Sequence, residues 1–236
     1  YGGYIYVSND YGATWTKPAT ITAAKNFMAI KMSDSGLHQT CVADNDYIYT
    51  SSDSGATWTQ KTSIGLKSYY DMAMSADGSI QYVVVLNGGG ILKSTDKWAT
   101  STSITTGLTQ NKVGSIEVSS TGTYITIVSF TDTGVNDPVI LSKDGGSTWT
   151  SFDPDGSTRT GWTSSNVGMS ADGRVQMLCY NTAALTGGLY FSIDYGTTWT
   201  NDVSINNNPC GVSVSRDGTY MLSGSNDLVI YNIFSD

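Results

Sequence analysis

One eight-residue motif, S-x-D-x-G-x-T-W, recurs along this chain and constrains its fold more than any other feature. Intact copies occupy residues 8–15, 51–58, 142–149 and 192–199. A damaged fifth copy, Ser94-Thr95-Asp96-Lys97-Trp98, lacks the glycine. The aspartates of the five copies, at positions 10, 53, 96, 144 and 194, are 43 to 50 residues apart. Self-similarity at such a period is the signature of a repeat protein, in which each repeat is one supersecondary unit.

The residue types in the motif predict a tight turn that follows a strand. A short apolar run precedes each intact copy, at residues 4–7, 47–49, 139–141 and 189–191. The aspartate can accept backbone N–H bonds inside the turn, and the serine and threonine hydroxyls can join that network. The glycine permits a positive φ. The tryptophan is expected to bury its ring, with its N–H reaching a polar neighbour.

A second landmark, a Ser-x-Asp-Gly-like turn, occurs once per repeat. Its copies are residues 33–36, 75–78, 119–122, 170–173 and 215–218. The short runs before them predict strands A at residues 27–32, 70–74, 113–118, 167–169 and 212–214. The runs after them predict strands B at residues 37–43, 80–86, 124–130, 175–180 and 220–223. The run before each motif is strand C and its tryptophan opens strand D, so each repeat has the four antiparallel strands of a propeller blade.

The motif resembles the Asp-box, or BNR repeat, and the chain is similar to Asp-box β-propellers of the sialidase-like superfamily over nearly its whole length. That superfamily includes sialidases, other glycan hydrolases and non-enzymatic sorting or assembly proteins. The resemblance implies that the box is structural and lies away from any catalytic face. The residues given this structural role are Asp10, Gly12, Trp15, Asp53, Gly55, Trp58, Asp96, Trp98, Asp144, Gly146, Trp149, Asp194, Gly196 and Trp199.

The expected fold is therefore all-β, a five-bladed β-propeller of four-stranded antiparallel blades in a single domain over residues 1–236. The expected blades span residues 27–68, 69–112, 113–163, 164–208, and 209–236 together with 1–26. In this arrangement both termini close the ring, because residues 4–16 would supply strands C and D beside strands A and B of residues 209–226. Residues 228–231 also read as a strand C, and the sequence leaves open which of the two segments takes that position.

Composition excludes several classes of function. The net charge of −8 and scattered basic residues argue against nucleic-acid and anionic-membrane partners. No apolar run approaches the roughly 20 residues of a membrane span. A single histidine excludes a multi-histidine metal site, and no cofactor is expected. Three cysteines, Cys41, Cys179 and Cys210, are expected to be buried thiols, with a Cys179–Cys210 bridge as the alternative. The chain starts at tyrosine without a signal peptide, and we expect a processed product or part of a longer polypeptide or surface assembly.

The third and fourth repeats carry insertions at residues 131–138, 151–165 and 181–188, which should gather on the rim opposite the boxes. Loops that lengthen on one face of a repeat array often mark its binding face. Exposed aromatic rings there could stack on sugar rings, beside one arginine. The candidate ligand-binding residues are Trp162, Tyr69, Tyr70, Phe130, Phe152, Tyr180 and Arg159.

The resemblance implies that sialidase activity needs three arginines on the substrate carboxylate, a Tyr–Glu nucleophile pair and an acid/base aspartate. Only Arg159 of the three arginines lies in an insertion, so the expected function is a non-catalytic, extracellular recognition or scaffold propeller that binds glycans or another protein. The first alternative is a structural protein on the surface of a microbe, alga or large virus. The second is a glycoside hydrolase with paired aspartates, for which the candidates are Asp71, Asp132, Asp137, Asp153 and Asp155.

Overall fold

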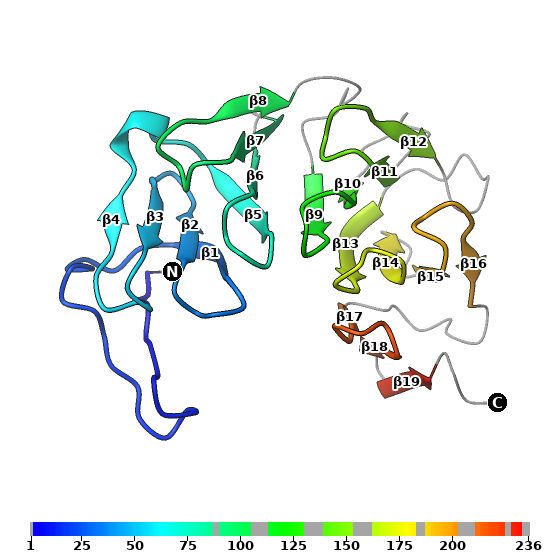
Figure 1. The fold of residues 1–236 in the computed structure, drawn as a ribbon, viewed down its shortest axis with the longest axis horizontal. Coiled ribbons are helices and arrows are strands. Elements are labelled where there is room, and N and C mark those ends of the chain that lie inside the picture. The colour runs from blue at the N-terminus through cyan, green and yellow to red at the C-terminus, as the bar shows by residue number, and fades with distance from the viewer. Residues whose placement is uncertain are drawn as a thin grey trace. The chain divides into compact units, whose positions relative to one another are not determined.

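The computed structural model describes residues 2–86, 90–104, 113–129, 139–152, 162–182, 187–202, 211–224 and 228–232 (Figure 1). The side chains of residues 162–165, 181–182 and 228–232 are not described. The chain divides into two compact units, Tyr1–Ile104 and Thr105–Asp236, and each is considered separately below.

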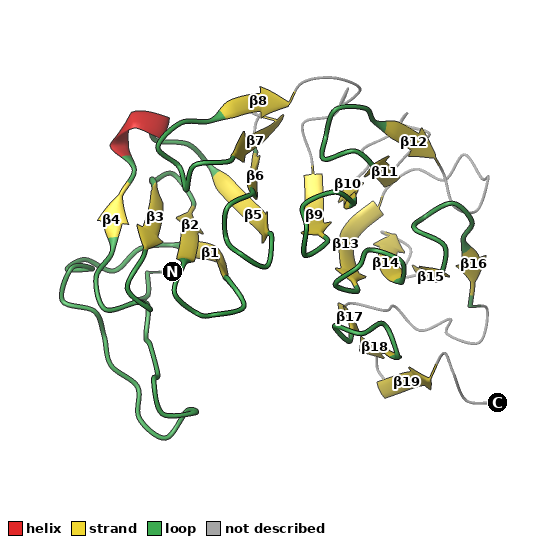
Figure 2. Ribbon diagram, viewed as in Figure 1, coloured by secondary structure: helices red, strands yellow, loops and turns green. Residues whose placement is uncertain are grey.

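The first unit contains two four-stranded sheets, ordered β1-β2-β3-β4 and β5-β6-β7-β8 (Figure 2). The strands of the first sheet are β1 (Phe27–Met32), β2 (Gln39–Ala43), β3 (Ile48–Ser51) and β4 (Thr59–Gln60). The strands of the second are β5 (Tyr69–Met74), β6 (Gln81–Val85), β7 (Gly90–Ser94) and β8 (Thr102–Ile104). One 3₁₀ turn, η1 (Thr62–Ile64), connects the two sheets.

The second unit contains three sheets, two of four strands and one in which three strands are described. The strands of the third sheet are β9 (Val113–Val118), β10 (Ile125–Ser129), β11 (Val139–Ser142) and β12 (Thr150–Phe152). Those of the fourth are β13 (Trp162–Met169), β14 (Gln176–Thr182), β15 (Gly187–Ser192) and β16 (Thr200–Asn201). Those of the fifth are β17 (Gly211–Val214), β18 (Tyr220–Gly224) and β19 (Leu228–Asn232).

Every sheet is an antiparallel meander in which each strand pairs with the next one in sequence. The second strands β2, β6 and β10 are buried along their whole length, which is why they read as continuous apolar or small-residue runs. The fourth strands β4, β8, β12 and β16 are short and largely exposed. The prediction of five antiparallel blades is confirmed, with strands in the order A, B, C, D in the first four sheets and with strands A, B and C described in the fifth.

The boxes form the predicted turns. In the copy at residues 51–58, the Asp53 carboxylate accepts bonds from the Thr57 N–H at 2.9 Å, the Thr57 hydroxyl at 2.5 Å and the Ser51 hydroxyl at 2.7 Å. Gly55 has φ of 86°, and its N–H donates to Ser51 Oγ at 2.9 Å. The indole of Trp58 donates to the carbonyl of Gly55 at 3.1 Å. The bonds to the aspartate recur in the other three intact copies, and the indole bond recurs at Trp149 and Trp199. The Trp15 ring is 62% exposed rather than buried.

The structure corrects the sequence interpretation of the damaged box. Trp98 is not the terminal tryptophan of a box that has lost its glycine; it occupies the glycine position itself, with φ of 66°. Its N–H donates to Ser94 Oγ at 2.8 Å, as Gly55 does to Ser51. Asp96 accepts bonds from the N–H and hydroxyl of Thr100 at 2.9 and 2.7 Å, so this turn keeps the full network.

Three of the boxes lie beside the A–B turn of their own sheet, as predicted. Backbone bonds of 3.2, 2.9 and 3.0 Å join Ser54 to Leu37, Gly145 to Thr123, and Tyr195 to Arg174. The A–B turns of successive sheets are also bonded within each unit. Asp34 N–H donates to the Ala76 carbonyl, Ser120 to Ala171, and Ala171 to Arg216. Boxes and A–B turns therefore share one rim in each unit.

The apolar core lies between neighbouring sheets. One cluster joins the first two sheets through residues such as Val42, Met72 and the buried ring of Trp98. A second joins the third and fourth sheets through Leu141, Leu178 and Tyr180, and a third joins the fourth and fifth through Met177, Leu189 and Met221. Within each unit, adjacent sheets thus bury their facing sides against one another, which stabilises the unit chiefly through removal of apolar area from water.

The two candidate C strands take different positions. β19 pairs along the whole of β18, so residues 228–232 fill the C position of the fifth sheet. The segment around residues 4–7 instead makes isolated antiparallel bridges, Gly3 with Lys25 and Val7 with Thr16. Its Ile5 side chain packs against Cys41 and Tyr49 of the first sheet. β17 and β19 occupy both edges of β18, so residues 228–232 take the C position that the sequence leaves open, and closure of the ring by both termini stays a prediction.

Candidate functional site

The structure describes the side chains of four of the predicted ligand-binding residues, Tyr69, Tyr70, Phe152 and Tyr180. Tyr69 and Tyr180 are buried, so their rings cannot stack on a ligand; the Tyr69 hydroxyl donates to the Gly65 carbonyl at 2.8 Å. Tyr70 is half-buried. Trp162 begins strand β13 rather than lying in a loop, and its side chain lies outside the described residues. Phe130 and Arg159 also lie outside them, as do the candidate acids other than Asp71 and most of the three insertions.

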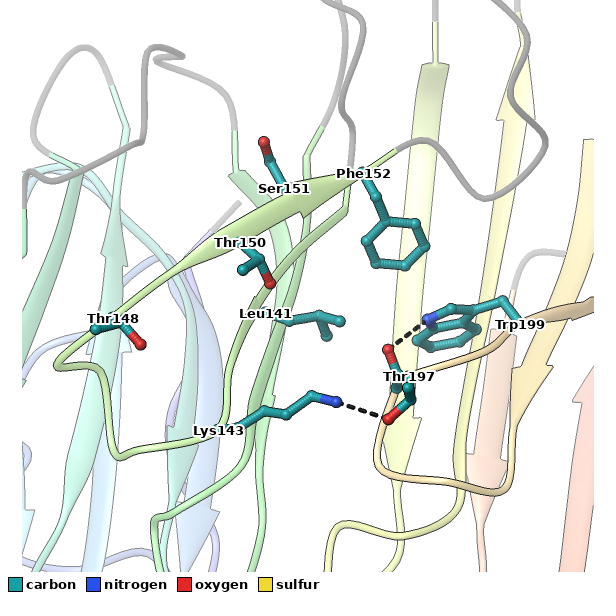
Figure 3. A pocket seen from close by; sticks show the side chains of 9 residues that line it. Leu141, Lys143, Thr148, Thr150, Ser151, Phe152, Thr197 and Trp199 are labelled. Atoms are coloured by element: carbon teal, nitrogen blue, oxygen red, sulfur yellow. Dashed lines mark hydrogen bonds between the residues drawn. The ribbon is translucent and has the colours of Figure 1, made fainter.

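Phe152 is the predicted ligand residue that the structure places in a described groove. The groove lies in the second unit, between strands β11 and β12 of the third sheet and the box of the fourth, and has a volume of about 410 Å³ (Figure 3). This volume is within the range of small-molecule sites. Its lining residues are Leu141, Lys143, Thr148, Thr150, Ser151, Phe152, Gly196, Thr197 and Trp199.

Two aromatic rings form the apolar part of the groove. The Phe152 and Trp199 ring centroids lie 5.8 Å apart with 34° between their planes, and both rings are half-buried. Both pack against the cluster that contains Leu141 and Tyr190, which limits their movement. Figure 3 shows both rings beside the same opening. Such rings offer apolar faces at a small cost in conformational entropy, because each has only two side-chain torsions.

The glycine of the fourth box sets how closely the two walls approach. Gly196 has φ of 71°, and a Cβ at this position would lie 3.1 Å from Leu141 Cδ1 and 3.4 Å from Gln176 Oε1. The turn can lie this close to β11 only because the residue has no side chain. The indole N–H of Trp199 donates to the Gly196 carbonyl at 3.3 Å, which orients the ring toward the groove (Figure 3).

Polar groups surround the rings. The Lys143 ammonium donates to Thr197 Oγ1 at 2.8 Å across the groove (Figure 3). Among the residues that the structure describes, Lys143 has no carboxylate partner and the Thr150 hydroxyl makes no hydrogen bond. An ammonium has three donors and a hydroxyl is both donor and acceptor, so both groups retain hydrogen-bonding capacity for a ligand.

The walls of the groove are held by the two box aspartates. Bonds from the side chain and then the backbone of Thr148 lower the pKa of Asp144 from 3.8 to about 2. Bonds from Thr198 do the same for Asp194. Both carboxylates are ionised at neutral pH and are engaged in their turns, so their role here is to position Thr148, Thr197 and Trp199.

Sequence reasoning missed Trp199, Lys143 and Thr150. Trp199 was assigned only a structural role, and the binding face was placed on the rim away from the boxes. The available signal was the repeat period: residues after one box face the next box across the gap between adjacent blades. Among the residues whose side chains are described, Phe152 is the only predicted ligand-binding residue that lines this groove.

Three further features bear on function: possible metal ligands, cysteines and apolar helices. No group of three or more histidine, cysteine or acidic residues there could hold a metal ion. Cys41 and Cys179 are buried free thiols, and burial raises the pKa of Cys41. No helix in the described residues has the length and apolar character that a membrane span requires.

Solved structures of several different proteins share this architecture. A GH74 enzyme from Niastella koreensis matches with a TM-score of 0.73 and 20% identity, over 94% of this chain and 37% of the other. An ancestral GH74 enzyme matches with a TM-score of 0.67 and 12% identity, over 98% of this chain and 32% of the other. A structure of a nidogen/laminin complex matches with a TM-score of 0.64 and 13% identity, over 98% and 87% of the two chains. No family profile and no curated protein matches the sequence.

This chain spans about a third of the length of the two GH74 enzymes. YCF48 from Cyanidioschyzon merolae matches with a TM-score of 0.56 and 13% identity, over 88% of this chain and 71% of the other. At these identities the likeness shows the fold alone, and it does not transfer an activity.

The comparisons correct one expectation. The chain was expected not to be an enzyme because it lacks the residues of a sialidase. Two of the similar structures are enzymes, so missing sialidase residues do not exclude catalysis on this fold.

The matched architecture, the five antiparallel meander sheets and the repeated turns together establish that this chain is an all-β protein with the β-propeller fold.

Proposed function

We propose that this chain binds carbohydrate in the groove between Phe152 and Trp199. The observation that carries the proposal is the pair of half-buried rings 5.8 Å apart, flanked by the Lys143 ammonium and the Thr150 hydroxyl. A sugar presents an apolar face of C–H groups and an edge of hydroxyls. The two rings suit the first and the polar groups suit the second.

The charge of Lys143 favours acidic sugars among the possible carbohydrate ligands. The chain carries a net charge of −8, and an anionic ligand would be repelled at long range. Within the groove, however, the Lys143 ammonium bonds to Thr197 Oγ1 and has no carboxylate partner among the described residues. The proposal therefore covers neutral sugars, with acidic sugars favoured where the acid group reaches Lys143. Such ligands fit the extracellular, cell-surface or virion-surface location that the sequence predicts.

The test is binding of a panel of neutral and acidic oligosaccharides, followed by calorimetry on the sugars that bind. Trp199→Ala and Phe152→Ala should each weaken binding roughly tenfold or more, since stacked rings dominate such sites. Trp15→Ala is the matched control, because this tryptophan has the same box position but is exposed and lies outside the groove. Thr150→Val tests whether the Thr150 hydroxyl contributes to sugar binding, because it removes the hydroxyl and leaves the core unchanged.

Three results would reject the proposal: no sugar binds, or Trp199→Ala and Trp15→Ala have equal effects, or the folded Phe152→Ala variant binds normally. Melting curves of every variant show whether lost binding reflects unfolding, because both groove rings pack on the core. The same sugars should be analysed for cleavage products, which would reveal turnover as well as binding.

A further inference from the structure

Two tyrosine rings stack between the third and fourth sheets, on the rim that carries the boxes. Tyr124 is the second residue after the turn glycine Gly122, and Tyr195 is the fourth residue of the box at residues 192–199. Their ring centroids lie 4.8 Å apart with 28° between the planes. Both residues are half-buried, so part of each remains open to solvent. Two phenols therefore meet near the surface, where two adjacent sheets join.

The Tyr124 ring is held by its own turn and by the turn of the next sheet. The N–H of Tyr124 donates to Ser119 Oγ at 3.0 Å, and its carbonyl accepts the N–H of Ser119 at 2.9 Å. The ring lies against Gly173, where an added Cβ would be 2.6 Å from Tyr124 Cδ2. The ring can lie this close only because residue 173 has no side chain. Tyr124 is thus fixed against the fourth sheet.

Tyr195 is fixed by the turn of its box. It has φ of 61°, and its N–H donates to the Arg174 carbonyl at 3.0 Å. The carboxylate of the adjacent Asp194 accepts bonds from the N–H and hydroxyl of Thr198 at 2.8 and 2.6 Å. The two rings therefore stay side by side as long as these turns are intact.

The same two positions of the repeat also join adjacent sheets in the first unit. They are occupied there by His38 and Lys97, and His38 Nε2 lies 2.8 Å from the Lys97 ammonium. In both units this part of the repeat brings side chains of neighbouring blades together. A covalent bond formed between them would tie one blade to the next.

A pair of phenols can form such a bond by oxidation. A one-electron oxidant removes the O–H hydrogen atom of each tyrosine and leaves two phenoxyl radicals. The radicals join through a ring carbon next to each phenol oxygen, and the hydrogen on each of these carbons then moves to the oxygen. The net loss is two hydrogen atoms, which reduce one molecule of hydrogen peroxide to two of water. Because the rings are already in contact, coupling within one molecule is faster than coupling between molecules in dilute solution.

We propose that Tyr124 and Tyr195 are a site of oxidative cross-linking, at which hydrogen peroxide and a haem peroxidase form a dityrosine bond between the third and fourth sheets. The bond closes a loop of the chain from residue 124 to residue 195, which restricts the unfolded chain and so stabilises the folded one. Such oxidants act outside cells, where the sequence predicts this chain to be located. Neither tyrosine lines the carbohydrate groove, and the proposal does not depend on that groove.

A second stacked tyrosine pair provides an internal comparison. Tyr180 and Tyr190 have ring centroids 6.0 Å apart, and each is 1% exposed. Burial shields them from a diffusing oxidant, and their rings are farther apart. Tyr11 is exposed but has no tyrosine ring beside it among the described residues, so it couples between molecules at a rate that falls with dilution. The cross-link expected within one molecule is therefore the one between Tyr124 and Tyr195.

The test treats the full chain, at low micromolar concentration, with a haem peroxidase and hydrogen peroxide. The monomer, isolated by size-exclusion chromatography, should show dityrosine fluorescence and a mass lower by two hydrogen atoms. Trypsin should release the peptides of residues 113–143 and 175–216 joined to each other, and Tyr124 is the only tyrosine of the first. Fragmentation spectra should place the other end of the cross-link at Tyr195.

Substitutions identify the two ends independently. Tyr195→Phe and Tyr124→Phe keep the rings but remove one phenol, and each should abolish the joined peptides. Tyr190→Phe is the matched control, because it removes a phenol from the same peptide and should leave the yield unchanged. The cross-linked monomer should melt roughly 5–15 °C above the untreated protein, whereas treated Tyr195→Phe should melt as before treatment.

The proposal is overturned if no cross-link forms within the monomer, if the joined peptides persist in Tyr195→Phe, or if Tyr190→Phe lowers their yield as much as Tyr195→Phe does. A cross-linked monomer that melts no higher than the untreated protein would overturn the stabilising role. Melting curves of the untreated variants show that each is folded, and the two phenylalanine variants at the site check one another.

Discussion

The indole Nε1 of Trp98 donates a hydrogen bond of 2.6 Å to Oε1 of Gln81, and both side chains are buried. The same oxygen accepts the hydroxyl of Thr40. One amide therefore satisfies two buried donors from two neighbouring sheets. This relationship gives the irregular box a structural role that the intact boxes do not have.

Replacement of Gln81 by leucine should leave both donors unpaired and lower the free energy of unfolding by about 2–4 kcal/mol. Urea denaturation measures the change. Gln39→Leu is the matched control, since Gln39 has the same strand position but only one amide bond, to the Gly36 carbonyl. Equal losses in the two variants would show that the indole and hydroxyl do not depend on Gln81.

Trp98→Gly tests whether the buried ring of Trp98 stabilises the protein by more than its positive φ destabilises it. Glycine would relieve a positive φ, a gain of about 1 kcal/mol, but would remove a fully buried ring worth about 3–5 kcal/mol. The expected result is a net loss of roughly 2–4 kcal/mol in urea denaturation. Ser54→Gly, at φ of 57° with no buried ring, should be neutral or stabilising. A Trp98→Gly protein as stable as the parent would contradict this account.

The box aspartates should make the protein sensitive to acid. Bonds from Thr57 and Thr14 lower the pKa values of Asp53 and Asp10 from 3.8 to about 2, and Thr100 does so for Asp96. Because the folded pKa is depressed, their stabilisation is complete above pH 4 and is lost as pH falls from about 4 to about 2.

We expect the melting temperature to fall steeply across that interval and Asp53→Asn to flatten the fall. Asp96→Asn should have a comparable effect, since Asp96 makes the same bonds. Asp44→Asn is the control, because the Asp44 carboxylate accepts only a 3.4 Å contact from the adjacent Asn45 amide. A pH profile unaltered by either box substitution would count against this explanation.

Gly188 should be intolerant of a side chain. A Cβ there would lie 2.6 Å from Tyr180 Cε1 and 2.8 Å from Tyr190 Cε2, two rings that stack 6.0 Å apart inside the fourth sheet. Gly188→Ala should therefore destabilise the protein by about 1–3 kcal/mol through overpacking. Gly211→Ala, on β17 with no atom within 4 Å of the new Cβ, should be neutral or slightly stabilising. Similar melting temperatures for the two variants would reject the packing argument.

The features read correctly from sequence are those built within one repeat. Ser51, Asp53, Gly55 and Thr57 bond one another within seven residues, so their types and spacing predict the turn without knowledge of the rest of the fold. Strand β1 begins and ends where the alternation of residues 27–32 predicts. The number of blades follows from the number of turns.

The features decided by tertiary structure are those that join one repeat to another. Trp98 reads in sequence as the last residue of a shortened box, and its φ and the bond from its N–H to Ser94 Oγ show that it holds the glycine position. Phe152 and Trp199 are 47 positions apart and meet because adjacent sheets pack face to face. Local patterning determines each blade through short-range hydrogen bonds, whereas the groove and the bond between Thr40 and Gln81 depend on which blades become neighbours, and no spacing within a single repeat encodes that contact.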